Sequence, residues 1–324
     1  MSSSETTSAT GKTTAIRAAW ENDPDVARRY AIAERATRPF CRMMVEMSHA
    51  LSSSSSTTTS SSSSTSSTKE GVDAKAVEVF DLGCGTGAVE AELYATLSEE
   101  EKEGMKVLAG DVSPPMLAYL TSRAEKEGWT GVTTHTVDGT KLPSSAVLEG
   151  KTFNHVYVGF AVFMLPPAVP KQLADMLKPG GTLALTSWAD LPWFPVLVEA
   201  YERMEDGPEQ PLQKDVWSAV TNGLAWQDRS FVKQTLEEAG LEKVEVRQER
   251  VAVDVGDADT VMGSMGFVLG ILSQAWPEGK REGWLIDAKR AFREVLLEKQ
   301  QQGEEGEGVE WVFEGIVGVG VKPE

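Results

Sequence analysis

The stretch "VFDLGCGTGAVEAEL" joins an apolar run to a helical pattern through three closely spaced glycines, Gly83, Gly85 and Gly87. Glycine at such spacing lets a backbone turn tightly and approach a ligand where a side chain would clash. With Ala88 in the last place, the same letters also satisfy the dinucleotide pattern G-x-G-x-x-G/A. The stretch therefore predicts a nucleotide-type site and leaves two kinds of ligand to be compared.

Asp81 stands two residues before the first glycine and separates those two ligands. A pyrophosphate, as in NAD, is doubly negative and favours a neutral loop at a helix N-terminus, so a carboxylate there would repel it. The same carboxylate suits a ligand that carries an ammonium and a sulfonium and no phosphate. S-adenosylmethionine is such a ligand, and the sequence holds no Tyr-x-x-x-Lys pattern of the kind that serves hydride transfer. The loop thus favours S-adenosylmethionine over NAD.

Two further aspartates follow the next two apolar runs. Asp111 can accept hydrogen bonds from both ribose hydroxyls, although an NAD site would place an acid there too. Asp138 can accept a hydrogen bond from an adenine amino group, and Val112, Met116 and Leu142 can cover the faces of the base. Either aspartate alone could equally cap the helix or turn that follows it. Three acids after three successive strands favour the ligand-binding interpretation.

Strand and helix patterns alternate along the middle of the chain. This alternation predicts an α/β fold with a doubly wound parallel sheet, which binds ligands beyond the carboxyl ends of its strands. The later sequence predicts a helix over 230–240, strands over 241–255 and 309–321, and two helices between those strands. The alternating strands are expected over 76–83, 105–111, 131–138, 153–160 and 182–188, and their helices over 88–98, 113–128 and 169–181.

Four segments in order, "DLGCGTG", "GDVSPPML", "VDGTKLP" and "LKPGGTLALTSW", are similar to the motifs of class I S-adenosylmethionine-dependent methyltransferases, the UbiE-like group especially. The resemblance covers residues 76–188 and implies a Rossmann-like, mostly parallel sheet of seven strands whose last strand is reversed. It implies S-adenosylmethionine as the cofactor. The residues that it assigns are Asp81, Gly83, Gly85 and Gly87 at the methionine part, Asp111 at the ribose, Asp138 and the adjacent Gly139 on the adenine side, and Phe160 near the methyl group.

The sequence departs from this family at two places. Phe153-Asn154 stands where the family often has Phe-Asp at the opening of the fourth strand, a change expected to affect structure only. About fifty residues separate the last two strands, where the family usually has a short hairpin. This insertion is expected to form a substrate lid.

The chain divides into three parts on this interpretation. Residues 1–51 form an N-terminal helical cap, which Pro39 is expected to divide into two helices. The Ser/Thr-rich tract over 52–70 predicts a disordered linker, because it offers almost nothing apolar to bury. Residues 71–324 form the methyltransferase domain, with lid insertions near 189–229 and 256–305.

The composition argues against several classes of partner. The 324-residue chain carries a formal net charge of −18 at pH 7, which repels phosphate backbones and anionic membrane surfaces. Neither a nucleic-acid nor a membrane partner is therefore expected. The two cysteines, Cys41 and Cys84, make no disulfide framework, no Cys/His cluster indicates a metal, and no secretory leader is recognisable. A cytoplasmic location is expected.

The expected lid indicates what the protein acts on. Any one of its large side chains could be a core residue, but together they indicate a small, largely apolar or aromatic acceptor methylated on O, N or S. Asp190 is better placed than the histidines to act as a base, although capping a turn is the favoured interpretation of this residue. Transfer driven by proximity is expected, with a base optional. Tyr30 and Arg35 could reach the cofactor carboxylate. The lid side chains are Trp188, Trp193, Phe194, Trp217, Trp226, Met262, Met265 and Phe267.

Three alternative functions stay open on the sequence. A protein methyltransferase could share the same cofactor core with a different lid. A non-catalytic binding protein could keep the cofactor fold without transferring a methyl group. An NAD-dependent oxidoreductase is less favoured, because Asp81 opposes a pyrophosphate.

Overall fold

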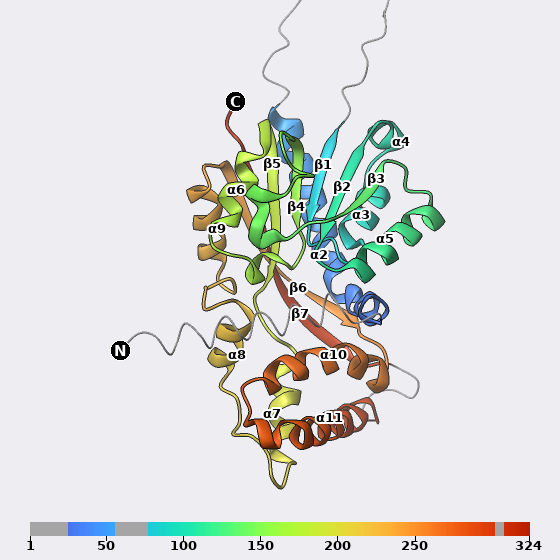
Figure 1. The fold of residues 1–324 in the computed structure, drawn as a ribbon, viewed down its shortest axis with the longest axis vertical. Coiled ribbons are helices and arrows are strands. Elements are labelled where there is room, and N and C mark those ends of the chain that lie inside the picture. The colour runs from blue at the N-terminus through green and yellow to red at the C-terminus, as the bar shows by residue number, and fades with distance from the viewer. Residues whose placement is uncertain (1–24, 56–76, 302–307) are drawn as a thin grey trace, which may run out of the picture.

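The computed structural model describes residues 25–55, 77–301 and 308–324, and its centre is one sheet of seven strands in the order β3-β2-β1-β4-β5-β7-β6 (Figure 1). All neighbouring strands pair in parallel except β7, which runs antiparallel to both β5 and β6. The predicted α/β fold with a mostly parallel sheet and a reversed last strand is therefore confirmed. The strands are β1 (Glu78–Leu82), β2 (Lys106–Asp111), β3 (Val132–Thr136), β4 (Phe153–Val158), β5 (Leu177–Trp188), β6 (Glu242–Asp254) and β7 (Glu310–Val321).

Helices cover both faces of this sheet. Two glycines of β7 show how closely the helices approach the sheet. A Cβ at Gly315 would lie 2.6 Å from Phe40 of α2 (Val26–Ser55), and a Cβ at Gly318 would lie 2.8 Å from Val232 of α9 (Arg229–Glu238). The two glycines are three residues apart and so face opposite sides of the strand. The helices on the side of α2 are α2 (Val26–Ser55), α3 (Ala88–Thr96) with the short α4 (Glu99–Lys102), and α5 (Pro114–Glu127), and those on the side of α9 are α6 (Val169–Asp175) and α9 (Arg229–Glu238).

The helix α2 is continuous, so the prediction that Pro39 divides it is wrong. Proline removes one backbone hydrogen bond and crowds the preceding turn. The next residues on the core face, Phe40 and Met44, are fully buried, and their packing holds the helix together. The helix also includes residues 52–55, so the linker prediction fails there. The rest of the predicted linker and residues 1–24 lie outside the described residues.

The other predicted elements occur in the predicted order, and β5 differs most in its bounds. It begins at Leu177, whereas the sequence predicted residue 182, and the preceding helix ends at Asp175. The N–H of Phe153 donates to the carbonyl of Met176, and Leu177 pairs with Phe153. This pairing draws the chain into the sheet before Pro179, Gly180 and Gly181, from which the sequence predicts the end of a helix.

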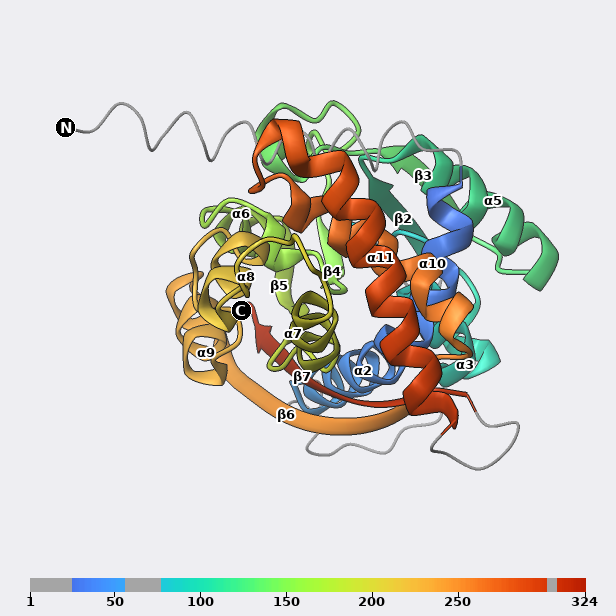
Figure 2. The ribbon, with the colours of Figure 1, turned by 90° about the horizontal axis from the view of Figure 1, so that it is seen from below.

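Four helices gather beyond the carboxyl ends of the parallel strands, at the lower end of Figure 1. α7 (Phe194–Glu202) and α8 (Gln213–Val220) follow β5, whereas α10 (Ala258–Ser273) and α11 (Glu278–Gln301) lie between β6 and β7. α10 packs against both α11 and α2, and α11 packs against α7 (Figure 2). Among the described residues, no helix combines the length and the apolarity needed to cross a membrane.

A buried ion pair joins α2 to the glycine loop. The Glu34 side chain is 6% exposed and lies 2.9 Å from Nη1 of Arg123 on α5. The same nitrogen donates to the carbonyl of Thr86 at 3.0 Å, and the Thr86 hydroxyl donates to Glu34 at 2.6 Å. One and two turns further along α2, Arg38 and Arg42 each lie 2.7 Å from the buried carboxylate of Glu92 on α3. These contacts fix α2 over the loop between β1 and α3.

We expect Glu34→Ala to lower the free energy of unfolding by about 3 kcal/mol, because it leaves the Arg123 guanidinium without its buried partner. The matched control is Glu237→Ala on α9, whose exposed pair with Lys233 should contribute about 0.5 kcal/mol or less. Urea unfolding of both variants provides the measurement. Equal losses in the two variants would contradict the structural role given to Glu34.

Candidate functional site

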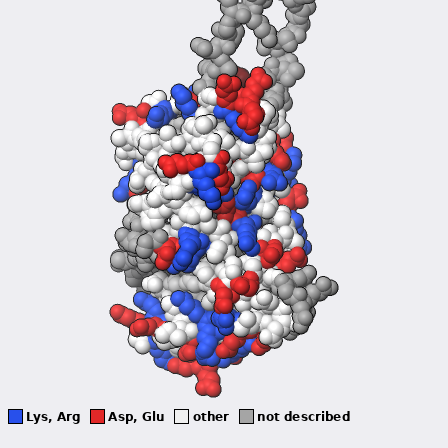
Figure 3. Space-filling model, turned by 90° about the vertical axis from the view of Figure 1, so that its right-hand side faces the viewer, with Lys and Arg blue, Asp and Glu red and all other residues white. Residues whose placement is uncertain are grey.

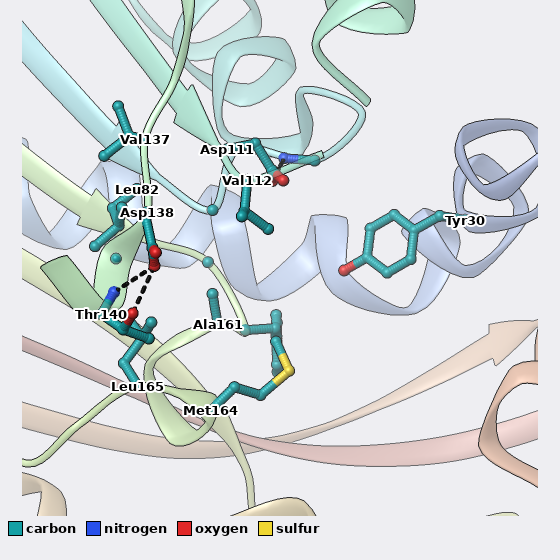
Figure 4. A pocket seen from close by; sticks show the side chains of 15 residues that line it. Tyr30, Leu82, Asp111, Val112, Val137, Asp138, Thr140, Ala161, Met164 and Leu165 are labelled. Carbon is teal, nitrogen blue, oxygen red and sulfur yellow. Dashed lines mark hydrogen bonds between the residues drawn. The ribbon is translucent and has the colours of Figure 1, made fainter. Parts of the chain in front are cut away.

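A cavity of about 180 Å³ opens at the carboxyl ends of β1, β2, β3 and β4 (Figure 4). Tyr30 of α2 closes one side, and its hydroxyl points into the cavity. Burial raises the pKa of this hydroxyl above its ordinary value, so the group keeps its proton and can donate a hydrogen bond. Of the site residues predicted from the sequence, those that line the cavity are Gly83, Gly85, Asp111, Val112, Asp138, Gly139 and Phe160.

The glycine loop has the left-handed backbone that its sequence predicts, with φ of +76° at Gly83, +52° at Gly85 and +91° at Gly87. Gly83 and Gly85 face the cavity. Gly87 lies behind the loop at the start of α3, where a Cβ would come within 2.4 Å of Leu120 on α5. Glycine at position 87 therefore serves helix packing, whereas the first two glycines leave the cavity floor open.

Asp111 connects the glycine loop to the following helix and also faces the cavity. Its carboxylate accepts hydrogen bonds from the N–H of Gly85 and from the N–H of Ser113, both at 2.9 Å. Burial raises the pKa of Asp111 above its ordinary value, and these backbone N–H groups work against the rise. A carboxylate has about four acceptor positions, so acceptor capacity remains for a ligand beside the bonds from Gly85, Ser113 and Val112. The capping and the ligand-binding interpretations of Asp111 are thus compatible.

Asp138 likewise begins a short helical turn at the cavity. It accepts hydrogen bonds from the N–H of Thr140 at 3.0 Å and from the Thr140 hydroxyl at 2.6 Å (Figure 4). Gly139 beside it allows Leu165 to approach, since a Cβ there would lie 2.8 Å from that side chain. Met116, predicted to cover the base, is instead packed with Val26 and outside the cavity lining.

Asp81 is fully buried and does not line the cavity directly. Neither of its oxygens receives a hydrogen bond from the described residues, and neither does the equally buried carboxyl of Glu90 on α3. Burial, with Glu90 and Asp111 beside it, raises the pKa of Asp81 well above its ordinary value. Burial raises the pKa of Glu90 to about 7. Both acids therefore hold a proton more tightly than an exposed carboxyl does, and a cationic ligand close by would favour their ionised forms.

Phe160 has the left-handed backbone that is rare for a residue with a large side chain, with φ of +52°. Its N–H donates to the hydroxyl of Thr186 on β5 at 2.9 Å, and its ring stacks on Trp188 with the centroids 3.9 Å apart. Backbone strain of this kind persists where the surroundings require it, often at functional sites. The ring of Phe160 therefore forms a fixed wall.

A second cavity of about 280 Å³ lies beyond that wall, between α2, α10, the turn after β5 and the start of β7. Tyr30, Phe160 and Met164 line both cavities, so the two cavities meet at these three side chains. The second lining is mainly apolar and aromatic. A ligand that extends from the first cavity past Phe160 would meet a second molecule in a site with few polar groups.

The structure separates the predicted lid side chains into two groups. Trp188, Trp193 and Met265 line the second cavity. Trp226 is buried against Phe231 of α9, with ring centroids 5.2 Å apart, and packs the core. The side chain of Phe267 is not among those that the structure describes. The predicted lid side chains that do not line either cavity are Phe194, Trp217, Trp226 and Met262.

Several lining residues were missed from the sequence. Trp311 and Phe313 of β7 line the second cavity, and their i, i+2 spacing already placed them on one face of a strand. Arg29 of α2 lines it as well, whereas Arg35, which was predicted to reach the cofactor, lines neither cavity. Asp190 lines the second cavity and accepts a hydrogen bond from the N–H of Leu191 at 2.8 Å.

We expect Glu90→Gln to stabilise the ligand-free protein at pH 8 and to change little at pH 5. In the folded protein the pKa of Glu90 is about 7, above its ordinary 4.5. The folded chain thus holds this proton more tightly than the unfolded chain, so the contribution to stability is complete below pH 4.5 and is lost as the pH rises through 7. The loss is on the order of 3 kcal/mol. Melting temperatures of Glu90→Gln and of the unaltered protein, measured from pH 5 to pH 8, test the expected pH dependence.

The control for that measurement is Glu103→Gln, which removes an exposed carboxylate near the end of α4. Its melting temperatures should run parallel to those of the unaltered protein. Parallel curves for Glu90→Gln as well would show that the buried acid does not titrate in this range.

Comparison with known proteins identifies the part of the chain that builds the first cavity. Residues 79–181 match the family described as a methyltransferase domain. The methyltransferase tpcH of Aspergillus fumigatus is 27% identical over 237 residues, which cover 70% of this chain and 79% of that protein. The acetylaranotin bis-thiomethyltransferase of Aspergillus terreus is 24% identical and covers 85% of this chain and 87% of that protein. The solved YcgJ protein of Bacillus subtilis aligns at a TM-score of 0.44 and 14% identity, over 77% of this chain and 93% of that chain.

The matched residues begin at β1 and its glycine loop and continue into β5, and the sheet has the reversed last strand expected of the class. The cofactor is S-adenosylmethionine, which removes the NAD alternative, while membership of the UbiE-like group stays a prediction. The chain is a class I S-adenosylmethionine-dependent methyltransferase.

Proposed function

We propose that the protein transfers the methyl group of S-adenosylmethionine to an oxygen, nitrogen or sulfur atom of a small, largely apolar or aromatic molecule. The observation that carries this proposal is the meeting of the two cavities at Tyr30, Phe160 and Met164. The first cavity has acids for a cationic nucleoside, and the second has aromatic walls for an acceptor. The Aspergillus terreus relative is named as a bis-thiomethyltransferase, which supports including thiols among the acceptors.

The chain's own residues fit the cofactor. Asp111 keeps free acceptor positions for the ribose hydroxyls, and Asp138 with Gly139 lies where the adenine side is expected. Gly83 and Gly85 leave the backbone open beneath the methionine part. The ionised form of the buried Asp81 carboxyl, which burial disfavours, would be stabilised by the positive end of the ligand. The bound cofactor supplies an electrophilic methyl group on a positive sulfur.

The enzyme's contribution to the reaction is positioning and exclusion of water. A nucleophile reacts when it is held in line at about 3–3.5 Å from the methyl carbon, and such positioning can supply much of the rate. Phe160 and Trp188 form the rigid wall that sets this approach. A low-polarity cavity removes water from the nucleophile and strengthens its attraction to the sulfonium. Asp190 is the carboxylate of the second lining that can take a proton from an acceptor holding one.

The surface agrees with a small-molecule acceptor. On the face shown in Figure 3, basic and acidic side chains alternate and no large field of one sign covers the described residues. Nucleic-acid binding surfaces gather lysine and arginine along one groove or helix. The face in Figure 3 gives a polyanion nothing of that kind to bind.

The function is tested by incubating the protein with S-adenosylmethionine labelled in its methyl group and with separate panels of aromatic thiols, phenols, amines and unfolded polypeptides. We expect label in at least one small aromatic panel, because the second cavity is apolar and enclosed by aromatic side chains. Label in polypeptides alone would instead favour a protein methyltransferase. Tight binding of S-adenosylhomocysteine with no label in any panel would favour a non-catalytic protein.

Asp111→Ala tests the ribose assignment. We expect the affinity for S-adenosylhomocysteine, measured by calorimetry, to fall by about 100-fold or more, because two hydrogen bonds to a charged acceptor are lost. Asp175→Ala, on the exposed side of α6, is the control and should bind normally. Melting curves of both variants show whether the fold survives the loss of the bonds to Gly85 and Ser113. Unchanged affinity in Asp111→Ala would refute the assignment.

A further inference from the structure

The helix α10 carries three glycines, Gly263, Gly266 and Gly270, within 16 residues. Glycine is among the least favourable residues in a helix interior, because it loses the most backbone freedom and packs no side chain. A close neighbour explains some glycines of this fold, as at Gly315 of strand β7, where a Cβ would lie 2.6 Å from Phe40. We therefore compared the surroundings of the three glycines of α10.

Packing within the protein does not require glycine at two of these positions. A Cβ at Gly263 or at Gly270 would meet no heavy atom of the described residues within 4 Å. Both lie in ordinary helical backbone, seven residues apart and therefore on nearly the same side of the helix. The two glycines differ in their position relative to the second cavity: Gly263 lines it, and Gly270 does not.

The absent side chain of Gly263 therefore leaves room inside the cavity itself. The cavity measures about 280 Å³. A cavity of roughly 150 Å³ with apolar walls is enough to hold one benzene ring. The volume in this protein thus exceeds the need of a single ring, and the aromatic walls from Trp188 and Trp311 suit a flat molecule.

We infer that Gly263 determines the size of the methyl acceptor, and that the space it leaves admits a fused bicyclic aromatic molecule where a larger residue would admit a single ring only. This inference rests on the proposed function, because it assumes that the acceptor occupies the second cavity. Gly263 acts here as a specificity-determining residue. It takes no part in the transfer.

The test compares Gly263→Leu with the size-matched control Gly270→Leu on two probe acceptors, thiophenol and 2-naphthalenethiol. We expect Gly263→Leu to lower kcat/KM for the bicyclic probe, relative to that for the single-ring probe, by about tenfold or more. Gly263→Ala should lower the same ratio by less and should raise the melting temperature, because alanine favours the helix. Gly270→Leu should leave the ratio unchanged.

Calorimetric titration of the S-adenosylhomocysteine-saturated protein with phenol and with 2-naphthol gives a second reading that needs no turnover. Selective loss of 2-naphthol binding in Gly263→Leu, without methyl transfer to any probe, would support the size role while the proposed function fails. The inference is wrong if the ratio is the same in the unaltered protein and Gly263→Leu, or if Gly270→Leu lowers it equally. It is also wrong if the unaltered protein neither binds nor methylates the bicyclic probes.

Discussion

The buried carboxylate of Glu34 bonds to Arg123 and to the Thr86 hydroxyl, and Arg123 also binds the carbonyl of Thr86 within the glycine loop. A carboxylate so far from water is stable only while these partners stay in place. The N-terminal helix is therefore held against the loop that forms the floor of the first cavity. Tyr30 lies one turn before Glu34, so the same contact brings its ring to the junction of the two cavities.

Buried carboxyl groups are concentrated beneath the first cavity. Asp81 and Glu90 have no hydrogen-bond donor among the described residues, while Asp111 uses backbone N–H groups of the loop and of the next helix. Unpaired buried acids are costly, and holding a proton on them reduces that cost, which is why burial raises their pKa values. A ligand with an ammonium and a sulfonium close to these acids would favour their ionised forms.

The second cavity depends on chain segments that are far apart in sequence. α2 precedes the sheet, α10 lies between its last two strands, and Trp311 and Phe313 stand at the start of β7. Phe160 and Trp188 connect this cavity to the first by direct stacking. Because these parts meet only in the folded chain, the second cavity depends on the N-terminal helix and the insertions, whereas the first cavity lies mainly at the strand ends of the sheet.

The order of strands and helices, the glycine loop and the three aspartates were predicted from local patterns, because each depends on periodicity or on a turn that nearby residues dictate. The prediction that Asp111 and Asp138 lie at strand ends is confirmed. The sequence does not decide whether they cap the following turn or face a ligand. In the structure both accept hydrogen bonds from backbone N–H groups of the following turn, and both line the first cavity. The predicted break at Pro39 is wrong, because the core packing of Phe40 and Met44 outweighs the local effect of the proline on the helix. Gly87 and Met116 could not be distinguished from ligand contacts, since their neighbours Leu120 and Val26 come from other helices.

The sequence by itself determined the fold class and the methyl donor, because charge, glycine spacing and periodicity act within a few residues of one another. The tertiary structure alone decided which aromatic side chains line the second cavity. Trp193 and Trp226 look alike in sequence, yet one lines the cavity and the other fills the core. That choice depends on how α2 and α10 pack against the sheet, and packing between distant segments leaves no periodic trace in the chain.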